Sequence, residues 1–300
     1  MGSMKYIVKV DTQPLFSFDE TSDKKALANF KKYLEDTKDP NPLNLFDSND
    51  ILIASTNPFL NKYASIPNEE WKYLKGIEQI DIHSPTSDRQ TIYFDMDGVL
   101  AKWGSGSSTS EMPSTEEIFD IKNHYFSKVK PDENAKNLFE ALSDKGYDVC
   151  VISNADKDTI LDKYFWLKEN FDIKDEQIFF APLKADKADF VKGNADISVL
   201  IDDNSAVLSK WEEHGGKGIK YYNGFNKNTL LSINFVSIEK KFQQLEDFIA
   251  ENDDYSDDFI EQKREALIHS LYSTTKRAIE KVEDTLERIS YLSNKEKEIE

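Results

Sequence analysis

The sequence predicts an α/β protein built on a parallel sheet, with a smaller domain before it and helices after it. From Thr91 onward, short apolar segments alternate with longer amphipathic ones. Strands that are apolar on both faces are typical of a parallel sheet covered by helices on each side. Past Asn234 the apolar spacing becomes helical and stays so. We therefore expect domains at 4–88, 89–233 and 234–300.

The first domain, 4–88, is expected to be small and α+β, with no chemical signature of its own. Lys5–Val10 alternates as a strand does, and Lys24–Leu34 has the apolar spacing of a short helix. Ile51–Ala54 is expected to be another short strand. The Met-Gly-Ser that precedes Met4 is typical of an expression tag and is left out of these expectations.

The main domain, 89–233, is expected to alternate strands with helices. Pro131 and Asp132 suit a helix start, and Gly146 suits its C-terminal cap. The expected strands are Thr91–Phe94, Tyr147–Ile152, Gln177–Phe180, Ile197–Ile201 and Gly218–Tyr222. The expected helices are Thr115–Tyr125, Asp132–Lys145, Lys157–Asn170, Lys184–Val191 and Ala206–Glu213.

The last domain, 234–300, is expected to be a helical hairpin. Val236, Phe242, Leu245 and Ile249 mark a first amphipathic helix, and an acidic turn follows it. A longer apolar stripe continues through Ile260, Leu267, Leu271, Ala278, Val282, Leu286, Ile289 and Leu292. The hairpin is expected to pack on the body of the protein, and the alternative is a coiled coil that forms a homodimer.

Composition limits the function. The net charge is -18 with a pI of about 4.7, so stable binding to nucleic acid or to an anionic membrane is disfavoured. No apolar run is long enough for a membrane span, and the N-terminus lacks the apolar region of a signal peptide. Cys150 is the single cysteine, so no internal disulfide can form. A cytoplasmic protein is expected.

Polar side chains follow several of the expected strands. They are Asp95 and Asp97 after the first strand, Ser153 and Asn154 after the second, and Asp202 and Asp203 after the fourth. Lys184 and Lys187 lie between the last two groups. The carboxyl ends of parallel strands meet at one edge of a sheet, where functional residues gather.

Together these groups have the chemistry of phosphoryl transfer. Asp95 and Asp202 offer carboxylate oxygens to Mg²⁺, and a carboxylate can attack a phosphorus atom held there. Asp97 could protonate the leaving oxygen, while Ser153 and a lysine hold the phosphoryl group. Taken alone, an Asp-x-Asp after a strand is most often a turn. The co-occurrence of all the groups in order favours function.

The segments DMDGVL, VISNA, KADF and VLIDDN resemble the four motifs of the haloacid dehalogenase (HAD) superfamily of phosphatases. The resemblance covers about residues 90–226 and implies a Rossmann-like HAD fold with a small cap at about 101–130. It implies these roles: Asp95 as nucleophile, Asp97 as general acid and base, Asp95, Asp202 and the Met96 carbonyl as Mg²⁺ ligands, Ser153 and Asn154 on phosphate, and Asp203 as an outer partner.

The resemblance leaves two details open. Lys187 fits the lysine motif better, and Lys184 is an acceptable substitute. The run LIDDNSAVLSKWEEHGGKGIKYYNGFN is similar to the 5'-nucleotidase branch, which resembles the deoxyribonucleotidases. Trp103 and the other cap aromatics could then stack on a base or simply pack the cap. Ser105–Ser110 could be a mobile flap.

The leading hypothesis is a Mg²⁺-dependent phosphomonoesterase that acts on a small phosphorylated metabolite, with a (deoxy)nucleoside monophosphate as one candidate. Sugar phosphates are an alternative substrate, and nucleic-acid ends are another that the net charge disfavours. In a different class, the α/β body would be the scaffold of a non-enzymatic interaction protein. Intact Asp95, Asp97 and Asp202 weigh against that hypothesis.

Overall fold

The computed structural model describes residues 2–66, 89–105, 112–119, 123–156, 159–191, 195–251 and 256–297. The chain forms two compact units that interleave along the sequence. The first comprises Met1–His83, Pro113–Lys128 and Ala155–Ile178, and the second comprises Ser84–Met112, Val129–Asn154 and Phe179–Glu300. The domain boundaries expected from the sequence stay a prediction. Two segments of the expected main domain, Pro113–Lys128 and Ala155–Ile178, belong to the same unit as the N-terminal residues.

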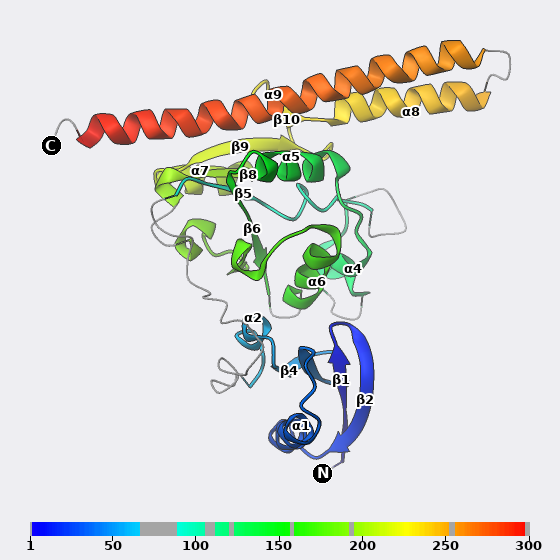
Figure 1. Ribbon diagram of the computed structural model, residues 1–300, viewed down its shortest axis with the longest axis vertical. Coiled ribbons are helices and arrows are strands. Elements are labelled where there is room, and N and C mark those ends of the chain that lie inside the picture. Colours follow the sequence, from blue (N-terminus) through cyan, green and yellow to red (C-terminus); the bar gives the residue numbers. More distant parts are fainter. Residues whose placement is uncertain are drawn as a thin grey trace. The chain divides into compact units, whose positions relative to one another are not determined.

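A six-stranded sheet forms the centre of the second unit (Figure 1). Its strands are β5 (Thr91–Phe94), β6 (Asp148–Ala155), β7 (Ile178–Pro182), β8 (Val199–Asp202), β9 (Lys217–Tyr222) and β10 (Ile233–Asn234). Their order is β10-β9-β8-β5-β6-β7, and the pairs β10–β9, β9–β8, β8–β5 and β5–β6 are parallel. This confirms the predicted α/β fold class with a Rossmann-like parallel sheet.

Helices on both faces bury this sheet. Tyr93 and Trp211 of α7 (Ser205–Glu213) pack edge to face, with ring centroids 5.3 Å apart. From the same strand, Phe94 packs against Phe139 of α5 (Glu133–Asp144) at 5.4 Å. Successive residues of a strand point to opposite faces, so these two contacts place the two helices on opposite sides. The N-cap of α5 is Asp132, whose carboxylate accepts hydrogen bonds from two backbone N–H groups of the first turn.

One expected helix of the main domain, Lys184–Val191, is wrong. The segment contains only the short 3₁₀ turn η4 (Lys187–Phe190). The backbone of Lys184 is left-handed, with φ of 66°, and Asp186 caps the turn through Ala188 N. A left-handed residue followed by a cap ends any helical path that begins at residue 184. A second 3₁₀ turn, η5 (Ala195–Ile197), precedes β8.

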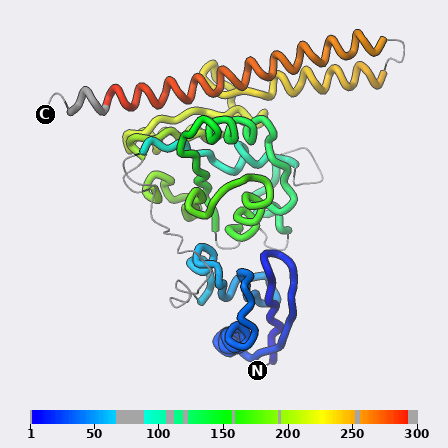
Figure 2. The backbone as a smooth tube through the Cα atoms, in the orientation of Figure 1, coloured from blue at the N-terminus to red at the C-terminus, as the bar shows by residue number. Residues whose placement is uncertain are grey.

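Two helices, α8 (Val236–Glu251) and α9 (Asp257–Lys297), complete the second unit. They contact each other, and Figure 2 shows them running side by side. The later part of α9 contacts α5, β8 and β9, and it buries Ala278, Val282, Leu286 and Ile289. Burial of each of the larger side chains, Val282, Leu286 and Ile289, stabilises the fold by about 1.5–3 kcal/mol and so holds α9 against α5 and the sheet.

The homodimer through these helices stays a prediction. Several large apolar side chains of α9 are exposed, namely Ile268, Tyr272, Tyr291 and Leu292. None of the described helices combines the length and the mean hydropathy that a membrane crossing requires.

A four-stranded antiparallel sheet in order β2-β1-β3-β4 forms the base of the first unit. Its strands are β1 (Met4–Val10), β2 (Gln13–Glu20), β3 (Leu43–Asp47) and β4 (Leu52–Ser55), and α1 (Asp23–Thr37) covers it. The core joins Tyr6 and Val8 to Phe30 of α1. β2 and β3 were not expected, because β2 is an edge strand with largely exposed side chains and β3 follows a proline-rich turn.

Among its described residues, the first unit has four further helical segments and a 3₁₀ turn. They are α2 (Pro58–Asn61), α3 (Thr115–Phe119), α4 (Tyr125–Lys128), α6 (Ile160–Asn170) and the turn η3 (Asp175–Gln177). Tyr164 of α6 stacks on Phe59, and its hydroxyl accepts a hydrogen bond from Asn57 at 3.1 Å. The expected helix Thr115–Tyr125 is divided into α3 and α4, and residues 120–122 between them lie outside the described residues.

Candidate active site

Asp95 lies at the end of β5, in the middle of the parallel sheet. β6 and β8 flank β5 on opposite sides, so the strand order reverses at this point. Such a switch point leaves a crevice beyond the carboxyl ends of the strands, where ligands bind in open α/β sheets. The backbone N–H of Asp95 donates to Ile201 O at 2.9 Å, which fixes this residue to β8. Asp97 follows in the turn that leaves β5.

Lys187 lies between the carboxylates of Asp95 and Asp202. Its Nζ is 2.8 Å from Asp95 Oδ1 and 2.8 Å from Asp202 Oδ2, and the side chain is 3% exposed. Burial acts to lower the pKa of Lys187, but the two carboxylates outweigh burial and raise that pKa well above its ordinary value. Lys184 is exposed and takes no part in this cluster. The geometry therefore favours Lys187 for the role that the sequence left open.

Asp95, Asp202 and Asp203 form an acidic group. One carboxylate oxygen from each lies within 4.8 Å of the others. Burial raises the pKa of Asp202, and the Lys187 ammonium opposes this shift. Burial, together with the charges of Asp95 and Asp202, raises the pKa of Asp203 to about 7. Three carboxylates around one ammonium leave excess negative charge, which a divalent cation would neutralise.

These donors fit a hard cation such as Mg²⁺. They are all oxygens, Asp95 and Asp202 are buried, and Mg²⁺ prefers one or two carboxylates together with water and substrate phosphate. Asp95 Oδ1 is occupied, since it accepts from Lys187 and from Met96 N at 2.8 Å. Among the described residues, none donates a hydrogen bond to Asp95 Oδ2. That oxygen is placed to meet an electrophile or a metal.

The Met96 carbonyl does not fit its expected role as a metal ligand. Its oxygen accepts hydrogen bonds from Ala101 N at 2.7 Å and from Val99 N at 3.3 Å. A carbonyl oxygen has two lone pairs, so these bonds use its capacity inside the turn. The metal hypothesis is therefore restricted to the carboxylates.

Gly98 allows the turn after Asp97 to close against the site. Its φ is 75°, in the left-handed region, and a Cβ here would overlap Trp103 Nε1 and Asp203 Oδ2. The indole N–H of Trp103 donates to Asp203 Oδ2 at 3.2 Å. Trp103, for which the sequence left base stacking and cap packing open, thus helps to hold Asp203 in place.

Ser153 and Asn154 lie near the carboxyl end of β6, at the same edge of the sheet. Ser153 is fully buried. The amide of Asn154 donates to Pro182 O at 2.9 Å and to Ala185 O at 3.1 Å. These bonds anchor the loop that leads to Lys187, so Asn154 positions the lysine segment. Phosphate binding by Ser153 stays a prediction.

Two asparagines of the site were missed from the sequence. Asn223 Nδ2 donates to Asp203 Oδ2 at 2.6 Å and to Gly98 O at 3.1 Å. Asn226 Nδ2 donates to Asp203 O at 2.8 Å. Both lie in the segment YYNGFN after β9, where an Asn-Gly pair was the available signal. These amides fix Asp203 against the turn that carries Asp97.

Apart from Trp103, the expected cap aromatics are Phe119, Tyr125 and Phe126, and they belong to the first unit. Tyr125 and Phe126 are buried and pack edge to face on each other, and Lys163 Nζ lies 4.4 Å from the Phe126 ring centre. This packing favours a structural role over stacking on a base. The side chain of Phe119 and residues 106–110 of the expected flap lie outside the described residues.

No protein-family model matches the chain, and no curated protein is similar to it in sequence. A HAD family hydrolase from Deinococcus radiodurans with bound phosphate and sodium aligns over 48% of this chain and 85% of its own, at 14% identity and a TM-score of 0.34. A mutant HAD family enzyme from Bacteroides thetaiotaomicron, in complex with magnesium and inorganic phosphate, aligns over 46% of this chain and 96% of its own, at 14% identity and a TM-score of 0.32. The HAD domain of effector protein Lem4 from Legionella pneumophila aligns over 52% of this chain and 93% of its own, at 14% identity and a TM-score of 0.26. These similarities are too weak to indicate an activity. The proposed activity therefore rests on the residues of the chain itself.

Proposed function

We propose that the chain is a Mg²⁺-dependent phosphomonoester hydrolase of the HAD type that works through an aspartyl-phosphate. The observation that carries the proposal is the position of Lys187, buried between Asp95 and Asp202 at the carboxyl edge of the sheet. A buried carboxylate with one occupied and one available oxygen suits a nucleophile, and a fixed ammonium beside it suits a phosphoryl group.

The proposed reaction has two displacements at phosphorus. In the first, Asp95 Oδ2 bonds to phosphorus as the ester P–O bond breaks, and Asp97 gives its proton to the leaving oxygen. In the second, Asp97 takes a proton from water, whose oxygen bonds to phosphorus as the bond to Asp95 breaks. The products are an alcohol and inorganic phosphate, and both aspartates return to their starting state.

The remaining residues bind and orient. Lys187 neutralises charge on the phosphoryl oxygens, and Asn154 holds the loop before it in place. Asp95 and Asp202, with Asp203 beside them, would hold the metal. When bound, Mg²⁺ would neutralise the carboxylates and polarise the phosphoryl oxygens.

The proposed substrate is a small phosphorylated metabolite, with a (deoxy)nucleoside monophosphate as one candidate and a sugar phosphate as another. The net charge of -18 argues against nucleic-acid ends, because no excess of basic residues is available to neutralise a chain of phosphates. The non-enzymatic scaffold remains the alternative of a different class. It gives no reason for an ammonium and three carboxylates to converge at the strand ends.

The test is hydrolysis of p-nitrophenyl phosphate by the purified full chain, with Mg²⁺ and with EDTA. Hydrolysis is expected with Mg²⁺ and not with EDTA. Asp95→Asn is expected to lower kcat by at least about 10³-fold, because an amide is not a nucleophile. Asp148→Asn makes the same change at the amino end of β6 and should leave kcat within about twofold.

Far-ultraviolet circular dichroism keeps a loss of activity distinct from a loss of fold. The proposal is wrong if the folded chain turns over no member of a phosphomonoester panel that includes nucleotides and sugar phosphates. It is equally wrong if Asp95→Asn and Asp148→Asn have the same activity.

A further inference from the structure

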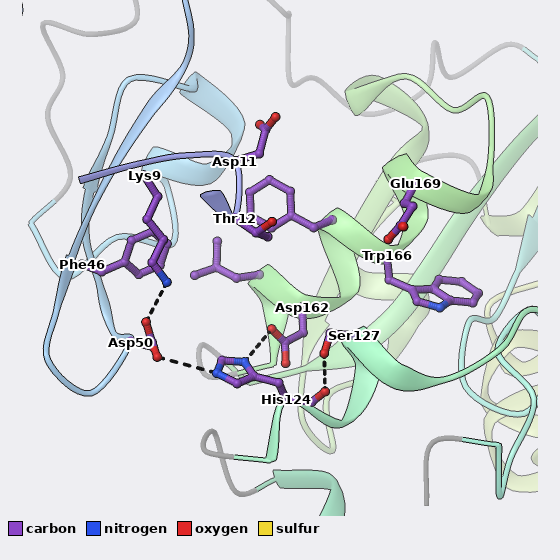
Figure 3. A pocket seen from close by; sticks show the side chains of 12 residues that line it. Lys9, Asp11, Thr12, Phe46, Asp50, His124, Ser127, Asp162, Trp166 and Glu169 are labelled. Carbon is purple, nitrogen blue, oxygen red and sulfur yellow. Dashed lines mark hydrogen bonds and ion pairs between the residues drawn. The ribbon is translucent and has the colours of Figure 1, made fainter. Parts of the chain in front are cut away.

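A cavity of about 320 Å³ lies within the first unit, and none of its lining residues belongs to the proposed active site (Figure 3). The antiparallel sheet and its turns line one side of it, with Lys9 of β1 and with Asp11 and Asp50 of the turns. Helix α6 lines another side, with Asp162 and Glu169 among its residues, and His124 enters from the segment before α4. A volume near 320 Å³ is at the small end of sites that hold small organic molecules.

The charges of this cavity are mainly negative. His124 lies between two carboxylates, with Nδ1 3.1 Å from Asp162 Oδ1 and Nε2 3.7 Å from Asp50 Oδ2. Lys9 Nζ is bound to Asp50 Oδ1 at 2.8 Å, so the lysine charge is already neutralised. Figure 3 shows this chain of contacts from Lys9 through Asp50 and His124 to Asp162. An anionic ligand would meet these carboxylates and be repelled.

Two further carboxylates of the lining are available to a ligand. Among the described residues, the side chains of Asp11 and Glu169 have no ion-pair partner, and both residues are exposed. They come from the two sides of the cavity, one from the β1–β2 turn and one from α6. A positive charge between them would be attracted by both.

Aromatic and aliphatic side chains supply the apolar part of the lining. Phe165 and Trp166 of α6 are next to Leu161 in the lining, and Trp166 is 3% exposed. The ring of Phe46 is covered by Lys9 Nζ at 4.5 Å, so a cation already lies on an aromatic face of this cavity. The lining therefore suits a molecule with both an apolar body and a positive charge.

The backbone around the cavity is also unusual. Asp11, Asp50 and His124 all have positive φ, at 49°, 59° and 43°. Turns between strands explain the first two, because such turns commonly need left-handed residues. His124 lies outside any hairpin, and its conformation is sparsely populated for a residue with a side chain. Residues held in such conformations cluster at ligand sites.

We propose that this cavity binds a small organic cation, an ammonium-bearing molecule with an apolar body. The carboxylates of Asp11 and Glu169 would meet the ammonium, and the α6 side chains Leu161 and Phe165 would meet the apolar body. The site differs in chemistry from the proposed active site, since it needs neither metal nor phosphate.

The experiment compares three probes of similar size and different charge by isothermal titration calorimetry on the full chain. They are 2-phenylethylamine, 2-phenylethanol and phenylacetate. We expect saturable binding of the amine, at least about tenfold tighter than binding of the alcohol or the acid, since a tenfold ratio needs only one favourable ionic contact. Equal binding of the three probes, or no saturable binding of the amine, overturns the proposal.

Two variants test the location. Glu169→Gln and Asp11→Asn are each expected to weaken binding of the amine by about three- to tenfold, because each removes one carboxylate from the lining. Both residues are exposed, so neither change threatens the fold, and asparagine tolerates the left-handed backbone of Asp11. Glu176→Gln removes the same charge in the same unit but outside the lining.

The control Glu176→Gln should leave binding within about twofold. If it weakens binding as much as Glu169→Gln does, the amine responds to overall charge, and the cavity is not its site. Hydrolysis of p-nitrophenyl phosphate has no part in these measurements, so the two proposals succeed or fail independently.

Discussion

Two clusters of the molecule have the same plan, a basic side chain between two aspartates, and they differ in burial. In the second unit, Lys187 lies between Asp95 and Asp202 and is 3% exposed. In the first unit, His124 lies between Asp50 and Asp162, and its side chain is 39% exposed. Burial removes the screening by water, so the charges around Lys187 interact several times more strongly than those around His124.

The difference teaches what each cluster can do. The buried one fixes its groups, shifts the pKa of Lys187 and Asp203, and leaves excess negative charge that a metal can neutralise. In the half-exposed cluster, His124 interacts weakly with its two aspartates. This cluster borders a cavity, so its side chains can rearrange around a ligand. Chemistry is expected at the first cluster and reversible binding at the second.

The largest effect is expected when the buried cluster loses its cation. Lys187→Met leaves Asp95 and Asp202 facing each other without an ammonium, and breaking a buried ion pair costs about 3–5 kcal/mol. The free energy of unfolding, measured in urea, should fall by about that amount. Under conditions where the variant is folded, kcat on p-nitrophenyl phosphate should fall by about 10²–10³-fold.

Lys184→Met is the matched control, because it removes the same charge three residues earlier at an exposed position. It should change the unfolding free energy by less than about 0.5 kcal/mol and leave kcat nearly unchanged. Equal losses in the two variants would contradict the assignment of the lysine.

The parallel sheet and its strand-end residues could be predicted because their signals are local. The strands β5 and β8 are buried throughout; Asp95 follows the first and Asp202 ends the second, and parallel topology brings those ends together. The choice between Lys184 and Lys187 depends on a left-handed backbone conformation at residue 184, which the amino-acid sequence alone does not specify. The bonds from the Asn154 side chain to the backbone carbonyls of Pro182 and Ala185 could not be predicted, because backbone carbonyls carry no sequence signal.

The cavity of the first unit could not be predicted, because it depends on contacts between distant segments. Its lining comes from the β1–β2 turn, residue 124 and α6, and the sequence assigned these segments to different domains. From the sequence alone, His124 is expected to be an ordinary, partly exposed histidine. Neither of its carboxylate partners is near it in the sequence, so no spacing rule applies.

A second prediction uses a left-handed position beside the buried cluster. Beside Asp97 this position is Gly98, where a Cβ would overlap Trp103 and Asp203. Gly98→Ala adds backbone strain to that overlap, and we expect a loss of about 2–4 kcal/mol in the free energy of unfolding. Gly146→Ala tests the strain alone, since Gly146 has φ of 87° and, apart from its chain neighbours, no atom of the described residues lies within 4 Å of the added Cβ; about 1–2 kcal/mol is expected. Similar losses in the two variants would contradict the close packing behind Asp97.

The smallest effect is expected at His124. His124→Asn keeps a residue that tolerates the left-handed backbone but removes the contacts to Asp50 and Asp162. Because these groups are partly exposed, we expect the free energy of unfolding to change by no more than about 1 kcal/mol. Half-exposed pairs are also screened by salt, so the difference between His124→Asn and the unchanged chain should shrink from about 0.05 M to about 0.5 M NaCl. The corresponding difference for Lys187→Met should persist at both salt concentrations, because its partners are buried. A large, salt-independent loss for His124→Asn would show that the two clusters are equally shielded from solvent, and the division between a catalytic cluster and a binding cluster would then lose its physical basis.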